Sequence, residues 1–187
     1  MEKAEKRAGY LKELLAEEEA VRELKREALH LPSWDLSYRQ VGEVELLLGG
    51  ACSPLSGFLG RADSESVYRT LRLADGTLWP LPLHLDVTEA FAAGLRSGDR
   101  VALRHPEGMV LAVLTVEDVW APDREAEAQA LYGTADERHA GVFQWVHETG
   151  PFSVGGRLEG VELPGHHTFK SLRLTPRALG QAFEERG

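Results

Sequence analysis

The strongest constraint on the fold lies in the middle of the chain, where two strand-like runs are separated by a tight turn. SGDRVALR ends at residue 104, HPEG occupies residues 105–108, and MVLAVLTVEDVW follows at residues 109–120. Both runs are rich in valine and leucine, and the proline and glycine stand where a type I turn prefers them. This spacing predicts two strands joined by a short turn.

Further strand signals stand on either side of this pair. The dipeptide Asp75-Gly76 separates LRL from TLWPLPLHLDV and predicts a hairpin, in which Pro80 and Pro82 confine the second run to a sheet edge. GPFSVGGRLEGVEL, at residues 150–163, predicts strands that are broken at Gly155-Gly156.

The first 30 residues predict a helix. They are dense in Glu, Lys, Ala and Leu, and Leu14, Val21 and Ala28 recur at an interval of seven, with Leu24 and Leu31 between them. One apolar stripe of this length favours a helix packed on its own domain over a coiled coil. We expect the helix to run over residues 2–30 and to end at Pro32.

Helix-capping residues mark the other helices. Ser37 and Gln40 match a capping box, and Gly49 stands where a left-handed C-terminal cap belongs. Asp63, Thr88 and Asp123 can cap the three helices that follow, the last of which should stop at Gly133; Thr175-Pro176 is an N-cap and first-turn pair for the helix PRALGQAFEER. A helical start, short strands with tight turns and scattered short helices predict an α+β fold with a small barrel or curled sheet.

Charge and cysteine content narrow the function classes. The net charge is −9, and Lys170 is the only lysine beyond Lys25, which makes nucleic acid an unlikely partner because phosphate binding needs clustered cations. Cys52 is the only cysteine, which suits a reducing compartment. We find no apolar run of membrane-spanning length and no signal peptide, so we expect a cytoplasmic chain that does not enter a membrane.

No motif within the chain specifies a reaction. Gly49-Gly50 follow a helix and lack the lysine of a phosphate-binding loop, so they are expected to form a helix end and a turn. Cys52 and Ser53 lack a nucleophile signature and are expected to be small, partly buried residues. The carboxylate pair Glu117-Asp118 is expected to be surface charge.

Metal binding is not expected either. The histidines are not spaced as zinc ligands, and Gly155-Gly156-Arg157 could approach an anion but is explained equally well by a tight turn. The seven histidines are His30, His84, His105, His139, His147, His166 and His167.

The string RQVGEVELLLGGACSPLSGFLGRAD resembles the start of the amino-terminal domain of the ATP sulfurylases, or sulfate adenylyltransferases. The resemblance continues through LRLADGTLWPLPLHLDV, GDRVALRHPEG, the stretch LAVLTVEDVWAPDREAEAQALYGTADERHAGV, VGGRLEG and LRLTPRAL, and it covers about residues 32–187. LPSWDL before the first motif is similar to the bacterial forms that are fused to an adenylylsulfate kinase.

This resemblance implies a PUA-like β-barrel with peripheral helices over residues 32–187, preceded by a helical extension over residues 1–31. In the family, sulfate and ATP react to adenylylsulfate and diphosphate in the next domain, through a Gln-x-Arg-Asn and a His-x-x-His stretch. This chain contains no asparagine and no His-x-x-His. We therefore expect no catalytic, cofactor-binding or metal-binding residue here, and no activity from the chain alone.

The resemblance also implies partners. These are a catalytic sulfurylase domain or subunit, with an adenylylsulfate kinase domain and further copies of the chain as additional candidates. The alternative hypothesis is a stand-alone PUA-like module that binds RNA or a small ligand. The family-motif residues, which we expect at a domain interface, are Arg39, Gln40, Pro54, Leu55, Gly57, Phe58 and His139.

Overall fold

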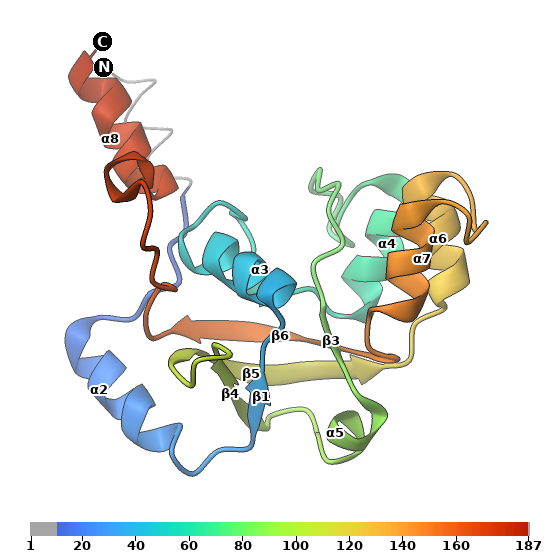
Figure 1. Cartoon of the computed structure of the whole chain (residues 1–187), viewed down its shortest axis with the longest axis horizontal. Helices are drawn as coiled ribbons and strands as arrows, with labels where there is room; N and C mark the ends of the chain where they lie inside the picture. Colours follow the sequence, from blue (N-terminus) through green and yellow to red (C-terminus); the bar gives the residue numbers. More distant parts are fainter. Residues whose placement is uncertain (1–10, 187) are drawn as a thin grey trace. The chain divides into compact units, whose positions relative to one another are not determined.

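A mixed sheet of six strands organises residues 11–186, the part of the chain that the computed structural model describes. The strand order is β1-β4-β5-β6-β2, and β3 pairs with β6 (Figure 1). β1 is parallel to β4, whereas β4–β5 and β3–β6 are antiparallel pairs. The strands are β1 (Ser33–Asp35), β2 (Gly57–Phe58), β3 (Leu85–Val87), β4 (Arg100–Arg104), β5 (Val110–Trp120) and β6 (Phe152–Gly160).

Helices join these strands, so the predicted α+β class is confirmed. The described chain divides into two compact units. Unit 1 takes its residues from Met1–Gly57, Arg100–Thr115 and Arg157–Gly187, and unit 2 consists of Phe58–Asp99 and Val116–Gly156. The helices of unit 1 are α2 (Glu18–Glu27), α3 (Tyr38–Leu48) and α8 (Pro176–Arg186), together with the 3-10 turn η1 (Lys170–Leu172). The helices of unit 2 are α4 (Arg61–Thr70), α5 (Glu89–Ala93), α6 (Arg124–Tyr132) and α7 (Ala140–His147).

The central strand pair forms as predicted. Ala102 of β4 lies opposite Val113 of β5, and both side chains are completely buried. In the turn, the His105 N–H donates to the Met109 carbonyl over 2.8 Å, and the Gly108 N–H donates to the His105 carbonyl over 2.7 Å. Gly108 adopts a φ of 94°, a conformation that residues with a Cβ rarely accept.

The N-terminal helix is shorter than predicted. α2 begins at Glu18, because residues before it join the sheet instead: Leu15 bridges Gly160, whose N–H donates to the Leu14 carbonyl over 2.7 Å. Residues 2–10 of the predicted helix lie outside the described part. α2 packs on its own unit, as expected, since Leu24 contacts Val113 and Val161. A domain boundary at residue 31 stays a prediction.

Arg100 also holds α2 against the sheet of unit 1. Its guanidinium pairs with Glu27 of α2 and with Glu159 of β6, each over 2.7 Å. The side chain is about 29% exposed, so these pairs are better shielded from water than ordinary surface pairs.

One predicted strand feature is confirmed only in part, and another is wrong. The hairpin at Asp75-Gly76 is reduced to one bridge between Arg72 and Leu78, since Pro80 and Pro82 supply no N–H to extend a ladder. The pair Gly155-Gly156 does not break a strand, because both residues lie within β6.

The reason for the glycine at position 155 is a close backbone approach. A Cβ at Gly155 would stand 2.3 Å from the Leu59 carbonyl oxygen and 2.6 Å from the Gly60 Cα. Only glycine allows the chain before α4 to lie this close to β6 within unit 2.

Helix capping is mostly as predicted. The Ser37–Gln40 capping box is confirmed, as are the side-chain caps at Thr88 and Asp123 and the left-handed Gly133. At the end of α3, however, Gly49 is right-handed, and the left-handed residue is Gly50, with a φ of 82°. At the last predicted cap, the Thr175 hydroxyl accepts from the Ala178 N–H over 3.2 Å.

Asp63 is not a cap. α4 begins at Arg61, whose N–H donates to the Asp118 carboxylate of β5 over 2.9 Å, while Asp63 accepts from the Ala74 N–H. Asp118 was expected to be plain surface charge. Its carboxylate instead accepts a hydrogen bond from a backbone N–H in the first turn of α4, a group that has no partner within the helix.

No helix among residues 11–186 combines the length and the apolar character needed to cross a membrane. The longest, α3 and α8, contain 11 residues each, well below the roughly 20 that a span requires.

Replacing Gly155 should test the close approach. We expect Gly155→Ala to lower the free energy of unfolding by about 3 kcal/mol, because the neighbouring atoms are backbone and cannot move aside. Gly42→Ala is the matched control: nothing lies within 4 Å of a Cβ there, and alanine should stabilise the interior of α3 by about 0.5–1 kcal/mol. Urea denaturation measures both, and equal effects would contradict the proposed close contact.

Candidate functional site

Two motif residues near the start of α3 have separate roles. Gln40 is buried, and its side-chain oxygen accepts from the Ser37 N–H over 3.0 Å and from the Trp34 indole over 3.2 Å. It therefore fixes the entry from β1 into α3. Arg39 is exposed and pairs with Glu43 one turn later over 2.6 Å.

The motif residues after α3 form a corner of the fold. Pro54 is exposed and follows a cis peptide bond, whereas Leu55, Gly57 and Phe58 are buried. His139 is exposed at the start of α7, with its ring 5.2 Å from that of Tyr132. The seven motif residues thus do not form one cluster, and the interface role stays a prediction for those with exposed side chains.

The glycine and cysteine candidates lie in the same corner. Gly50 packs closely on the backbone of Lys12, and the Ser53 hydroxyl accepts from the Lys12 N–H and donates to the Gly50 carbonyl, each over 2.7 Å. Cys52 is buried, and this burial, reinforced by the charge of Glu43, raises the pKa of its thiol to about 11. A neutral thiol of this kind is a poor nucleophile.

The histidines have separate surroundings. His84 is buried, His166 pairs with Glu45 over 2.6 Å, and His147 with Glu137 over 3.1 Å. Within residues 11–186, no three His, Cys, Asp or Glu side chains are arranged to hold a metal ion.

Unit 2 contains a buried polar network that the sequence did not predict, centred on Arg124 of α6. One guanidinium nitrogen of Arg124 donates to Glu127 over 2.8 Å and contacts the His84 Nε2 over 2.9 Å. The other donates to the Gly150 carbonyl over 2.7 Å and to the Ser153 hydroxyl over 3.3 Å. Because arginine can only donate, His84 accepts at Nε2 and carries its proton at Nδ1.

Aromatic rings enclose this network. The Arg124 guanidinium lies 5.5 Å from the centre of the Trp145 ring, and the indole N–H of Trp145 donates to Glu127 over 3.2 Å. The ring of His84 meets those of Trp120 and Trp145 edge-on, at 5.8 and 5.9 Å. Burial raises the pKa of Glu127, an effect that the Arg124 charge opposes. The network therefore fixes the orientation of the Glu127 carboxylate and shields it from solvent.

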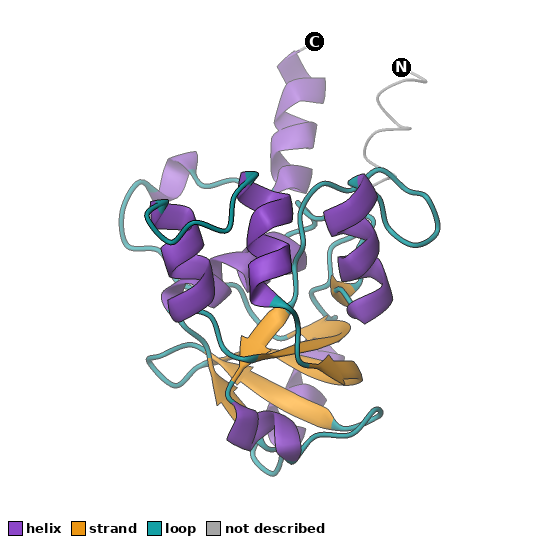
Figure 2. Ribbon diagram, turned by 90° about the vertical axis from the view of Figure 1, so that its right-hand side faces the viewer, coloured by secondary structure: helices purple, strands orange, loops and turns teal. Residues whose placement is uncertain are grey.

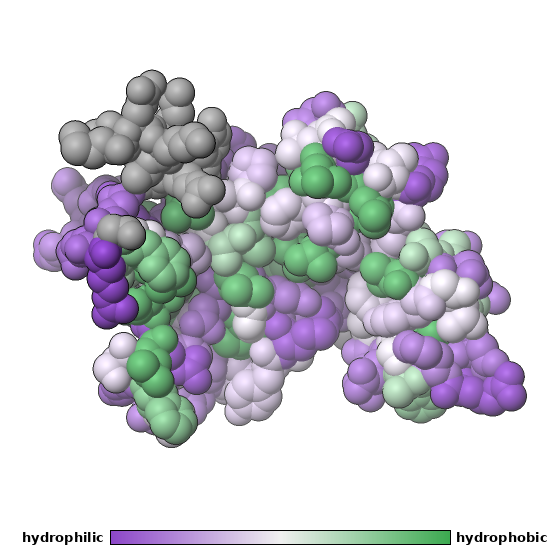
Figure 3. Space-filling model, turned by 90° about the horizontal axis from the view of Figure 1, so that it is seen from above, coloured by the Kyte–Doolittle hydropathy of each residue, from purple (hydrophilic) through white to green (hydrophobic). Residues whose placement is uncertain are grey.

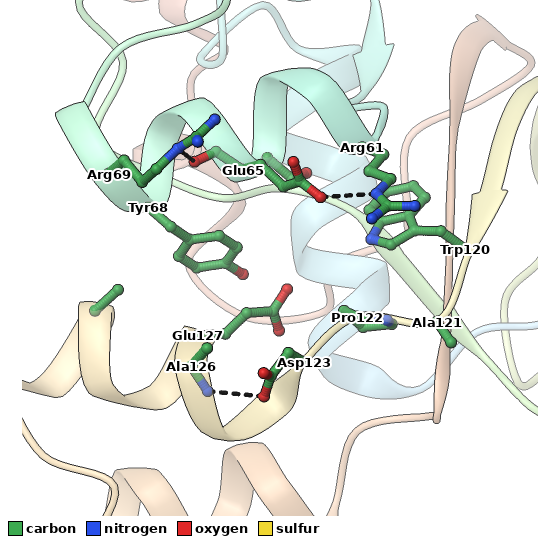
Figure 4. A pocket seen from close by; sticks show the side chains of 12 residues that line it. Arg61, Glu65, Tyr68, Arg69, Trp120, Ala121, Pro122, Asp123, Ala126 and Glu127 are labelled. Carbon is green, nitrogen blue, oxygen red and sulfur yellow. Dashed lines mark hydrogen bonds and ion pairs between the residues drawn. The ribbon is translucent and has the colours of Figure 1, made fainter.

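A cavity of about 400 Å³ opens beside this network in unit 2 (Figure 4). Its walls come from α4, α6 and the end of β5. Tyr68 projects from α4 and Glu127 from α6, and the two side chains point toward one another. The volume is within the range of small-molecule sites. The lining residues are Arg61, Ser64, Glu65, Tyr68, Arg69, Trp120, Ala121, Pro122, Asp123, Ala126, Glu127 and Ala130.

Sequence comparisons connect this chain with a larger protein. Residues 4–163 match the family model described as a PUA-like domain. The sulfate adenylyltransferase of Eremothecium gossypii is 41% identical over 94% of this chain, and that of Saccharomyces cerevisiae is 41% identical over 82%. The chain covers 35% and 30% of these relatives, about a third of their length.

A solved structure supports the same fold. The chain of a hexameric APS kinase from Thiobacillus denitrificans superposes with a TM-score of 0.75 at 38% identity. The match covers 95% of this chain and 30% of that one. The predicted PUA-like fold and the resemblance to the sulfate adenylyltransferases are both confirmed.

The buried thiol should react slowly. Because the folded structure raises the pKa of Cys52 from 9.0 to about 11, the thiolate fraction at pH 8 should fall about 100-fold on folding. We expect alkylation by iodoacetamide at pH 8 to be slower by at least this factor in the folded chain than in urea. Because the sequence has one cysteine, all alkylation reports on Cys52. Equal alkylation rates in the folded chain and in urea would contradict the burial of this thiol.

Removing the cation of the network should destabilise unit 2. In Arg124→Met, Glu127 stays buried without its cation, and we expect a loss of about 3–5 kcal/mol in the free energy of unfolding. The loss should grow as pH rises above the unfolded pKa of Glu127, because the folded state then holds a proton that the unfolded state releases. The double variant Arg124→Met/Glu127→Leu should recover part of the loss. Urea denaturation at pH 5 and pH 8 measures this, and a loss independent of pH would contradict the role of Glu127.

Proposed function

The chain belongs to the PUA-like domain family, and from this premise we propose that it is the structural and regulatory domain of a sulfate adenylyltransferase. The observation that carries the proposal is the 41% identity to such an enzyme over 94% of this chain and 35% of the enzyme. This is the relation expected between one domain and a larger enzyme. On this reading, the catalytic residues lie in the part of the enzyme that the chain does not match.

The paired arginines support a non-catalytic role. Transfer of an adenylyl group to sulfate brings two anions together, which needs several cations directed at one point. In the described part of the chain, at least seven of the fifteen arginines are already paired with carboxylates of the same unit. These are Arg22, Arg39, Arg61, Arg100, Arg124, Arg138 and Arg177.

The C-terminal segment of unit 1 offers a surface for the rest of the enzyme. α8 stands away from the strands of its unit in both ribbon views (Figures 1 and 2), and none of its described residues is buried. Apolar side chains nevertheless gather there, and green atoms lie at the left of Figure 3, on the side where Figure 1 places α8. We name this set the C-terminal apolar face: Phe169 (75% exposed), Leu172 (77%), Leu174 (50%), Leu179 (40%) and Phe183 (62%).

The partner that best fits this face is the catalytic domain or subunit of the enzyme. Leu179 and Phe183 stand four residues apart and so share one side of α8, with Leu172 and Leu174 just before the helix. Covering such side chains stabilises a complex by about 25 cal/mol for each Å² removed from water. An APS kinase domain is a further possible neighbour, since a hexameric APS kinase contains a similarly folded part. The net charge of −9 disfavours the alternative of RNA binding.

A split enzyme tests this proposal. We would co-express the chain with the part of the Saccharomyces cerevisiae sulfate adenylyltransferase that it does not match, and measure co-purification and adenylylsulfate formation. We expect a complex whose activity depends on the chain, while the chain alone shows none. Leu172→Glu/Phe183→Glu should weaken the complex by at least about 100-fold, because it places two charges in an apolar contact.

The matched control is Leu78→Glu/Leu81→Glu. These leucines of unit 2 are 65% and 55% exposed, so this variant adds the same charges to an equally open surface outside the C-terminal apolar face. It should leave the complex intact. Equal weakening by both variants, or activity of the remaining enzyme without the chain, would overturn the proposal.

A further inference from the structure

We propose that the C-terminal apolar face docks on a surface of the catalytic part whose rim is acidic, and that Lys170 and Arg173 steer the two together. The inference rests on the proposed function, because it describes the chemistry of the same docking site. Nothing in the comparisons assigns a charge to the partner's surface.

Charge is segregated along the sequence. Residues 163–183 contain three Lys or Arg and no Asp or Glu, and they are the longest stretch of the sequence without an acidic residue. The other 166 residues contain 18 Lys or Arg and all 30 Asp or Glu. The segment that carries the C-terminal apolar face is therefore positively charged on an otherwise acidic chain.

Two ion pairs anchor this segment to the rest of unit 1. His166 pairs with Glu45 of α3 over 2.6 Å, and Arg177 at the start of α8 pairs with Glu13 over 3.3 Å. Both carboxylates are thus occupied at the two ends of the segment. Between the anchors, residues 167–174 are all exposed.

The two cations between the anchors have no acidic partner. Lys170 lies in η1, and its ammonium group forms no hydrogen bond or ion pair with any residue among 11–186. Arg173 donates its Nε to the Thr168 carbonyl over 3.2 Å and likewise pairs with no described carboxylate. Along the chain, both alternate with residues of the C-terminal apolar face. Apolar side chains among exposed charges have the composition of a docking surface with a polar rim.

Cations at such a rim act mainly on the rate of association. They stay solvated, so they add little affinity, but they attract opposite charge over about 10 Å at 0.1 M salt. The net charge of −9 would repel an acidic partner from most other directions. An acidic rim on the partner would therefore favour encounters in which this segment leads.

A protein surface fits this segment better than an anionic membrane does. A helix that lies on a membrane carries cations over its polar face. The helix α8 instead ends with Glu184 and Glu185 before Arg186, and anionic lipid would repel a chain of net charge −9.

Stopped-flow mixing of the full chain with the unmatched part of the Saccharomyces cerevisiae enzyme tests the proposal. We expect the association rate constant to fall at least about tenfold between 50 and 500 mM NaCl, because salt screens the attraction. Lys170→Glu/Arg173→Glu should associate at least about tenfold more slowly at 50 mM NaCl, and added salt should not slow it further. Lys170→Gln/Arg173→Gln should give an intermediate rate.

The matched control is Arg72→Glu/Arg96→Glu, which produces the same net charge. Both arginines are exposed in unit 2, where their guanidinium groups donate to nearby carbonyls and pair with no described carboxylate. This variant should associate within about twofold of the unaltered chain and keep its salt dependence. Equal slowing by both charge-reversed variants would attribute the effect to net charge and overturn the proposal.

The outcomes separate this inference from the proposed function. A complex whose association rate responds neither to salt nor to Lys170→Glu/Arg173→Glu would overturn the acidic rim and leave the proposed function standing. Absence of a complex at both salt concentrations would overturn both. Binding of the chain to phosphatidylserine vesicles that this variant abolishes, with an unchanged rate of association with the enzyme, would assign the cations to a membrane instead.

Discussion

The backbone pairing of β5 and β6 is the constraint on which the rest of the structure depends. β5 passes from unit 1 into unit 2 after Thr115, and β6 passes back after Gly156. Each unit is therefore completed by segments that are far apart in sequence. Gly155, one residue before the crossing in β6, must stay without a side chain because the backbone at Leu59 and Gly60 lies against it. A single methyl group at this position would disturb the start of α4 and the wall of the cavity that α4 forms.

The two units differ in the chemistry of their side chains. Unit 1 combines a buried strand core, clamped by Arg100, with a C-terminal segment whose apolar side chains remain uncovered. Unit 2 instead uses a buried guanidinium, that of Arg124, to connect α6 with the segments around His84 and Gly150. An apolar surface suits docking, and a dry polar wall suits a small ligand.

Much of the fold could be predicted from local sequence signals. The turn at residues 105–108, the Ser37–Gln40 capping box and the cap at Asp123 each depend on residues close in sequence, and each was confirmed. The failures share a different cause. Gly155-Gly156 resembles a strand break, and the requirement for glycine comes from Leu59, almost a hundred residues earlier. Asp118 resembles surface charge, and its partner is the start of α4.

The cavity could not be predicted for the same reason. Arg124 and Glu127 stand three apart in a helix, which is also the pattern of an exposed ion pair. The available signal was the alternation of His84 and Asp86 with leucines in LHLDV, where polar residues interrupt a run that is otherwise buried. Such a pattern indicates buried polar groups without naming their partners.

The central claim is that the C-terminal apolar face contacts the catalytic part of a sulfate adenylyltransferase. Hydrogen–deuterium exchange of the chain, alone and together with the unmatched part of the Saccharomyces cerevisiae enzyme, tests it most directly. The account predicts slower exchange in residues 169–186 on mixing and unchanged exchange in residues 71–81. Protection confined to other segments, with residues 169–186 exchanging as in the chain alone, would contradict it.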